Sequence, residues 1–123
     1  MSMHSVLVIE DDDFVKNMLK QTFERAGYDV ATASNGRIGI QLYQANPFDV
    51  VITDLIMPDM EGIETITHLR KINPGVKVIA ISGGGRNRPD DYLQLAAKLG
   101  ALKTFVKPVD RNALLEAVKD LVS

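Results

Sequence analysis

Five short apolar runs rich in β-branched residues recur along this chain, and a stretch with helical periodicity follows each of them. The runs lie near residues 5–10, 28–33, 49–53, 76–81 and 102–106. Strict alternation of strands and helices, joined by right-handed crossovers, predicts a doubly wound α/β fold with a five-stranded parallel sheet. The apolar stripes of the helices are expected at Phe14, Val15, Met18, Leu19 and Phe23; at Ile38, Leu42 and Tyr43; at Ile63, Ile66 and Leu69; at Tyr92, Leu93, Ala96 and Leu99; and at Leu114, Leu115, Val118, Leu121 and Val122.

Residues at the expected helix ends agree with this pattern. Asp12 and Asp13 are expected to cap and begin the first helix, and Asp110 to cap the last one. Residues that disfavour a continuing helix follow the first four helices, namely Gly27, Pro47, Pro74-Gly75 and Gly100. The strand pattern therefore has a matching helix pattern between its members.

The first, third and fourth runs are apolar on both alternating faces, which is typical of strands covered by helices on each side. Periodicity does not determine strand order. The order 2-1-3-4-5 is common for a chain of five such units, and it places a crevice at the carboxyl ends of the first and third strands. We therefore expect any functional site at that edge.

The size and charge of the chain limit what it can be. Its 123 residues suit one domain with one core, and we expect a single domain over residues 1–123. The formal net charge is −2 with charges scattered, so the basic surface of a nucleic-acid-binding protein is missing. Cysteine is absent, which excludes disulfides and thiolate metal sites. No basic segment precedes a long apolar one, so we expect a cytoplasmic protein without a signal peptide or membrane span.

Acidic, hydroxyl and basic residues stand where four of the apolar runs end. They are Glu10-Asp11, Asp54, Ser82 and Lys107-Pro108. Carboxylates gathered at one sheet edge would repel each other by about 4 kcal/mol per pair at an effective dielectric near 20, so the cluster needs a cation. An all-oxygen set suits Mg²⁺, which commonly pairs one or two carboxylates with phosphate oxygens. We expect Glu10 and Asp11 to hold the ion and Asp54 to add an oxygen.

Such a site permits in-line attack by the Asp54 carboxylate on a phosphoryl donor, which gives an aspartyl phosphate. Lys107 is a compact cation on a flexible stem and could reach one phosphoryl oxygen. The Ser82 hydroxyl could donate a hydrogen bond to another. These residue types in this order therefore indicate phosphoryl transfer.

Together these residues resemble a known family, the receiver domain of two-component response regulators. The resemblance covers essentially the whole chain, with Glu10-Asp11, Asp54 followed by Met57-Pro58 and Gly62, then Ser82 and Lys107-Pro108. It implies a flavodoxin-like receiver fold and a phosphoacceptor Asp54 that is served by a sensor histidine kinase or a histidine phosphotransfer protein. It also implies Mg²⁺ bound with help from the backbone carbonyl of Ile56, phosphoryl contacts from Ser82 and Lys107, and a cis Lys107-Pro108 bond.

The chain departs from the family pattern at three places. Thr104 stands where receivers usually carry Tyr or Phe, and Phe105 next to it points to the other face of the strand, so the aromatic rotamer switch of the family is in question. Three glycines follow Ser82 and make the main chain there unusually free in φ and ψ, and we hypothesise that phosphorylation acts mainly by ordering the 83–90 loop. Apolar Ile56 offers no side chain to orient an attacking water, which predicts slow self-dephosphorylation.

We expect a stand-alone phosphoacceptor switch without turnover of a separate substrate, because no further domain follows Ser123. The signal would pass to a downstream protein target, with the chain a monomer or a weak phosphorylation-linked dimer, and without direct contact to nucleic acid or membrane. Two alternatives stay open. The chain could be a receiver-like adaptor that is never phosphorylated, or a small Mg²⁺-dependent phosphatase or flavodoxin-like cofactor protein.

Overall fold

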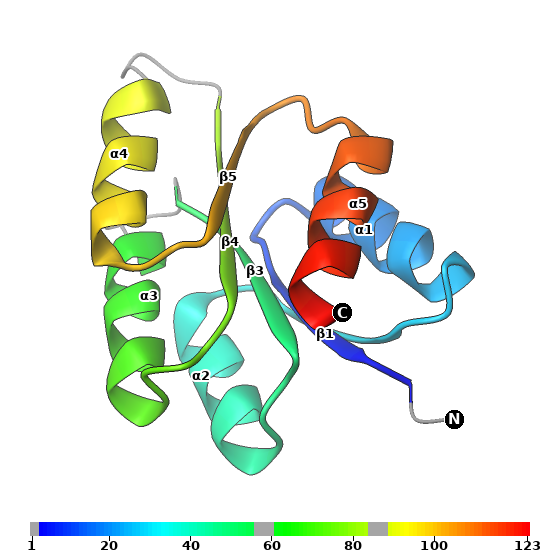
Figure 1. The fold of residues 1–123 in the computed structure, drawn as a ribbon, viewed down its shortest axis with the longest axis horizontal. Helices are drawn as coiled ribbons and strands as arrows, with labels where there is room; N and C mark the ends of the chain where they lie inside the picture. The colour runs from blue at the N-terminus through cyan, green and yellow to red at the C-terminus, as the bar shows by residue number, and fades with distance from the viewer. Residues whose placement is uncertain (1–2, 56–60, 84–88) are drawn as a thin grey trace.

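The structure is a computed structural model that describes residues 3–55, 61–83 and 89–123. Strands and helices alternate through these residues as the sequence predicts (Figure 1). The strands are β1 (Ser5–Ile9), β2 (Asp29–Ala33), β3 (Val50–Asp54), β4 (Val78–Ser82) and β5 (Lys103–Val106). The helices are α1 (Asp13–Arg25), α2 (Gly36–Ala45), α3 (Glu61–Ile72), α4 (Pro89–Leu99) and α5 (Arg111–Val122).

The strands form one parallel sheet in the order β2-β1-β3-β4-β5, so the predicted order is confirmed. Strand β3 lies at the centre of the sheet, with β1 and β2 on one side and β4 and β5 on the other. Strands β1 and β3 are neighbours, with Val6 beside Val50 and Ile9 beside Thr53. The carboxyl ends of β1, β3, β4 and β5 therefore share one edge of the sheet. The residues that follow or end these strands lie next to each other there.

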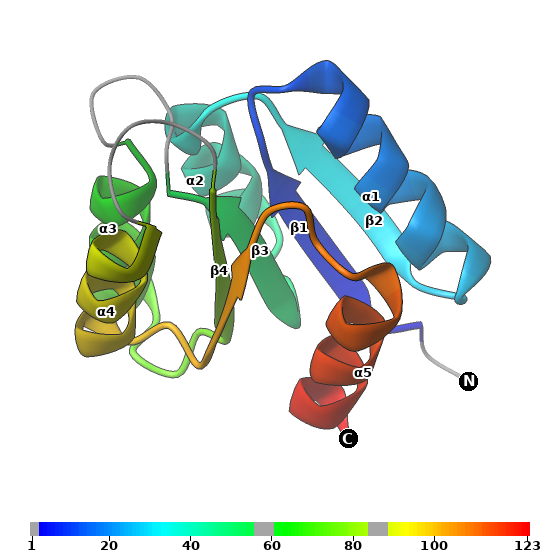
Figure 2. The same cartoon turned by 90° about the horizontal axis from the view of Figure 1, so that it is seen from above.

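Two hydrophobic clusters cover the two faces of the sheet. Helices α2, α3 and α4 pack on one face through residues such as Tyr43, Leu69 and Ala96, and α1 and α5 pack on the other through Phe23 and Val118 (Figures 1 and 2). Strands β3 and β4 are buried at every position, as expected of strands with helices on both sides. None of the helices in the described part of the chain is long and apolar enough to span a lipid bilayer.

Side chains cap the helices where the sequence predicts. Asp12 Oδ1 accepts hydrogen bonds from the backbone N–H groups of Phe14 (2.9 Å) and Val15 (3.2 Å), which satisfies donors that a helix start leaves free. Asp13 lies in the first turn of α1, as expected. Gly27 and Gly100 follow α1 and α4 with φ of 96° and 116°, a left-handed conformation that favours glycine.

The prediction of the apolar helix faces is wrong at two positions. Phe14 is 79% exposed and Ile38 is 40% exposed, although both were expected in the core. Each lies in the first turn of its helix, beside the carboxyl edge of the sheet, and neither joins a core cluster. Periodicity shows which face of a helix is apolar but not where the sheet beneath it ends. The side chains of Tyr92 and Leu93 lie outside the described residues.

The cap of α5 gives a test of the fold. Asp110 Oδ1 accepts from the N–H groups of Asn112 (2.9 Å) and Ala113 (3.2 Å). Replacing Asp110 by Ala should therefore lower the free energy of unfolding by about 1 kcal/mol, measured by urea denaturation. Asp110→Asn keeps an oxygen acceptor and should stay close to the wild type. Equal losses in the two variants would contradict a capping role.

Candidate phosphoacceptor site

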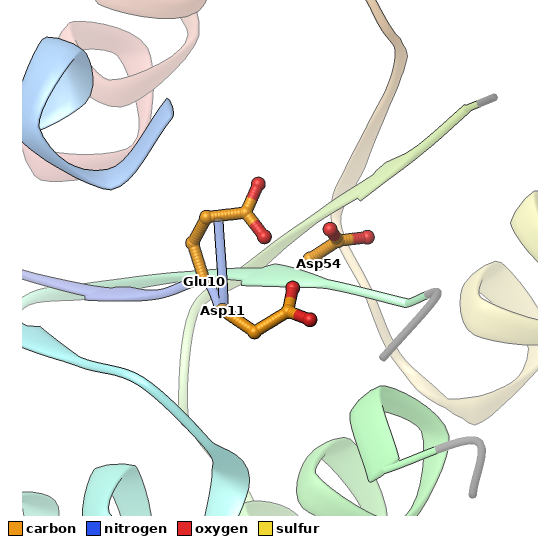
Figure 3. A group of neighbouring side chains, drawn as sticks. All are labelled: Glu10, Asp11 and Asp54. Atoms are coloured by element: carbon orange, nitrogen blue, oxygen red, sulfur yellow. The ribbon is translucent and has the colours of Figure 1, made fainter. Parts of the chain in front are cut away.

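Three carboxylates from two neighbouring strands meet at the carboxyl edge of the sheet. Glu10 and Asp11 follow β1, Asp54 ends β3, and one carboxylate oxygen from each lies within 4.8 Å of the other two. Figure 3 shows the three groups turned toward one another. Glu10 and Asp54 are nearly buried, at 2% and 4% exposure, whereas Asp11 is exposed. The backbone N–H of Glu10 donates to the Ala33 carbonyl (2.9 Å), which ties this residue to β2 as well.

Lys107 neutralises the two buried acids. Its Nζ donates to Glu10 Oε1 at 2.6 Å and to Asp54 Oδ2 at 2.7 Å. Its backbone N–H donates to the Ser82 carbonyl (2.9 Å), so the lysine follows β5 directly beside the end of β4. A single cation between two buried acids offsets the repulsion that their ionised forms would otherwise exert on each other. The structure therefore brings together Glu10, Asp11, Asp54 and Lys107, as the sequence predicts.

Burial and proximity shift the acid–base chemistry of this group. Burial is the main cause that raises the pKa of Glu10 to about 8; a hydrogen bond with Asp54 adds to the rise and the bond from Lys107 opposes it. Burial lowers the pKa of Lys107, but its hydrogen bonds to Asp54 and Glu10 outweigh this, so the net pKa lies above the ordinary lysine value. Lys107 is therefore a permanent cation, whereas Glu10 holds a proton more readily than an exposed glutamate.

The carboxylates fit a magnesium ion in their chemistry. All three offer oxygen, which Mg²⁺ prefers, and Glu10 Oε2 is buried without a hydrogen-bond partner among the described residues. An orphaned buried oxygen is costly unless something pairs with it, and a cation would do so. Ile56, whose backbone carbonyl the resemblance adds to this set, lies outside the described residues.

Ser82 lies at the same edge, and its hydroxyl has no hydrogen-bond partner among the described residues. Ser82 is the last residue of β4 and is fully buried. Ile81 pairs with Asp54 in the sheet register and Ser82 pairs with Val106, so Ser82 stands one residue beyond Asp54 and next to Lys107. A buried hydroxyl without a partner at this place is available to a group that enters the site.

The structure also tests the departures from the family pattern. Thr104 is exposed, whereas Phe105 packs against the cluster beneath α1 and α5, so the two side chains lie on opposite faces of β5 as predicted. The Lys107-Pro108 bond is cis, as the resemblance implies. The loop hypothesis involves residues 84–88, which lie outside the described residues.

Two features of the site were missed by the sequence analysis. Lys107 contacts both Glu10 and Asp54 without a phosphoryl group, and no pattern in the sequence indicates such a double contact. Gly62 and Gly83 approach the main chain of Asp54 and Lys107 so closely that neither has room for a side chain. Their signal was present in the sequence, since each glycine stands within a few residues of a site motif.

Comparisons with known proteins agree with the fold. The response regulator receiver domain family matches residues 6–119. The chemotaxis protein CheY of Thermotoga maritima is 37% identical over 114 residues, 92% of this chain and 92% of that protein. The transcriptional regulatory protein GlrR of Escherichia coli is 32% identical, and the match spans 94% of this chain but only 25% of that protein. A receiver domain crystal structure from Clostridium thermocellum superposes with a TM-score of 0.89 at 33% identity, covering 98% of this chain and 94% of the other.

The raised pKa of Glu10 predicts a pH-dependent stability. Because the folded protein holds this proton more tightly than the unfolded chain, its contribution is present at low pH and is lost as pH rises from about 5 through about 8. In Glu10→Gln, which resembles the protonated form, this loss is absent. With a chelator present, the stability of the wild type relative to Glu10→Gln should fall by on the order of 1–3 kcal/mol between pH 5 and 8.5.

Urea denaturation of both proteins at each pH measures this difference, since most other titrating groups cancel between them. A constant difference across the range would show that Glu10 titrates in the ordinary way. Adding Mg²⁺ to the wild type should reverse part of the loss at high pH, because a bound cation favours the ionised carboxylate.

Proposed function

Since this chain belongs to the response regulator receiver family, a family of phosphoacceptor signalling switches, we propose that Asp54 accepts a phosphoryl group from a phosphohistidine donor in a Mg²⁺-dependent reaction. The observation that carries the proposal is the placement of Lys107 Nζ within hydrogen-bond distance of both Asp54 and Glu10, beside Asp11. This set supplies a nucleophile, a permanent cation and metal-binding oxygens at one sheet edge.

In the proposed step, an Asp54 carboxylate oxygen attacks the phosphorus of the phosphohistidine in line with the bond to the leaving nitrogen. The new O–P bond forms, the N–P bond breaks, and the imidazole nitrogen keeps the electron pair. When bound, Mg²⁺ would neutralise charge on the transferring oxygens, and Glu10, Asp11 and Asp54 would hold it. The family resemblance adds the backbone carbonyl of Ile56 to this set. The imidazole leaves as the neutral ring when its other nitrogen already carries a proton, or when that nitrogen gains one from water as the N–P bond breaks.

Lys107 and Ser82 complete the proposed site. The lysine ammonium can leave Asp54 Oδ2 for a phosphoryl oxygen and still keep its bond to Glu10, because it is a flexible point charge. The buried Ser82 hydroxyl can donate to a second phosphoryl oxygen and gain its missing partner. Both changes pull side chains toward the phosphoryl group, which supports a switch whose surface differs between the two states.

The proposed role is signalling through protein contacts rather than enzymatic turnover. Asp54 is modified once per cycle, and we expect slow hydrolysis to reset it. The phosphoryl donor would be a sensor histidine kinase or a histidine phosphotransfer protein in the cytoplasm, and the phosphorylated chain would act on a downstream protein target. A monomer or a weak phosphorylation-linked dimer fits this role.

One exposed side chain supports docking of a protein donor at this site. Phe14 is 79% exposed in the first turn of α1, three residues after Asp11. A protein donor must cover the surface around the start of α1 to bring its histidine to Asp54. A large apolar side chain on this rim of the site can serve as an anchor.

Mass measurement tests the phosphoacceptor directly. Incubation with acetyl phosphate and Mg²⁺ should add the mass of one phosphoryl group to the wild type and to Glu64→Gln, an exposed acid on α3. Asp54→Asn should gain nothing, because the amide is not a nucleophile of this kind. Modification of Asp54→Asn to the wild-type extent would end the proposal. A wild type that stays unmodified would favour the adaptor, and release of free phosphate without a modified protein would favour the phosphatase.

Phe14→Ala gives a separate test of donor docking. With a phosphotransfer protein that phosphorylates the wild type, kcat/KM should drop about tenfold, as expected when an apolar anchor worth about 1.4 kcal/mol is lost. With acetyl phosphate the rate should not change, because a small donor does not reach the rim. A Phe14→Leu variant retains apolar area and should lose less. Equal rates from the protein donor would remove Phe14 from the docking surface.

A further inference from the structure

Gly83 lies close against the main chain of Lys107. A Cβ built on Gly83 would lie 2.7 Å from the backbone nitrogen of Lys107, 2.7 Å from its Cβ and 3.1 Å from its Cα. Nonbonded heavy atoms prefer about 3.5–4.0 Å. Two of these three atoms belong to the main chain, so a side chain at this position would have to displace the backbone of one strand end.

Space, not backbone conformation, is what requires glycine here. Among the described glycines, positive φ is found at Gly27 and Gly100, not at Gly83. The backbone of Gly83 is therefore one that other residues can adopt. The residue before Gly83 also holds Lys107, because the Lys107 backbone N–H donates to the Ser82 carbonyl at 2.9 Å. The glycine and this hydrogen bond together fix where the lysine side chain begins.

The position of that starting point matters because the ammonium must meet two acids at once. Its contacts with Glu10 Oε1 and Asp54 Oδ2 are 2.6 and 2.7 Å, and N–H···O hydrogen bonds in proteins extend only to about 3.2 Å. A flexible stem can restore one such contact after a shift of its base. Restoring both contacts together is harder, since the two oxygens belong to different strands.

We propose that Gly83 is a positioning residue for phosphoryl transfer, which acts by letting the Lys107 main chain approach β4 and so sets the reach of its ammonium to Asp54 and Glu10. This inference rests on the proposed function. Gly62 is the counterpart on the nucleophile side: a Cβ there would collide with the Asp54 carbonyl oxygen and lie 2.6 Å from Leu55 Cα. The two side-chain-free positions thus hold the cation and the nucleophile at their working separation.

A double-mutant cycle tests the assignment of Gly83. The rate of phosphorylation by acetyl phosphate with Mg²⁺ is measured by intact mass for the wild type, Gly83→Ala, Lys107→Ala and the double variant. Gly83→Ala should slow the reaction about tenfold, as expected for a displacement of less than 1 Å. Lys107→Ala should slow it at least as much. Gly83→Ala should add no further loss in the Lys107→Ala background, because it acts through that side chain.

Gly75→Ala is the matched control. Gly75 lies in an exposed turn where an added Cβ would meet only the Asn73 side chain, at 3.4 Å, so the rate should equal that of the wild type. Thermal unfolding of every variant confirms that the measured protein is folded. If Gly83→Ala is unfolded in plain buffer, all variants are compared in trimethylamine oxide, which favours the compact state.

Three results would overturn the inference. They are a wild-type rate in folded Gly83→Ala, a further loss when Gly83→Ala is added to Lys107→Ala, and a Lys107→Ala variant that reacts at the wild-type rate. All three differ from failure of the proposed function, in which the wild type itself would not be phosphorylated.

Discussion

The hydrogen bonds from the Lys107 ammonium to Glu10 and Asp54 are the interaction on which the rest of this site depends. Two carboxylates at 2% and 4% exposure could not share one sheet edge as anions without a cation between them. Removing one partner from such a buried group typically costs about 3–5 kcal/mol, because it leaves a charge unpaired. The ion pairs of the site are thus already formed before any ligand binds. A phosphoryl group or a metal ion would change which oxygens share the positive charge, and it would not create the cluster from separated parts.

The sheet makes this contact possible by placing distant segments side by side. Glu10 directly follows β1, Asp54 ends β3, and Lys107 directly follows β5, with β4 between β3 and β5. Burial on both faces fixes the register, since a shift of one residue would turn apolar side chains of β3 and β4 to the wrong helices. The positions of the site residues at the sheet edge are therefore fixed by packing in the buried core of the sheet. The glycines at positions 39, 62 and 83 contribute in the same way, by allowing main chain and helices to approach the strand ends closely.

Much of this architecture could be predicted from the residues, for identifiable reasons. Alternating apolar runs and helical stripes report secondary structure directly, and the strand order followed from the usual topology of such chains. The convergence of Glu10, Asp54 and Lys107 follows from that order. The exposure of Phe14 could not be predicted, because periodicity does not report where the sheet ends. The raised pKa of Glu10 depends on burial and neighbours that only tertiary packing supplies. Gly83 was interpreted as a source of backbone freedom, whereas the structure shows that it provides room.

Glu10 and its lysine partner stand 97 positions apart, so the ribosome synthesises one long before the other. Glu10 and Asp54 are synthesised before Lys107, which neutralises them in the folded protein. A nascent chain that has exposed only its first strands therefore has acidic residues at the strand ends without this cation. Pairing of β1 with β3 must wait for, or survive without, this counter-ion. A partly synthesised chain would therefore be unable to take up a signal, and competence to receive one would arise only when the last strand has docked.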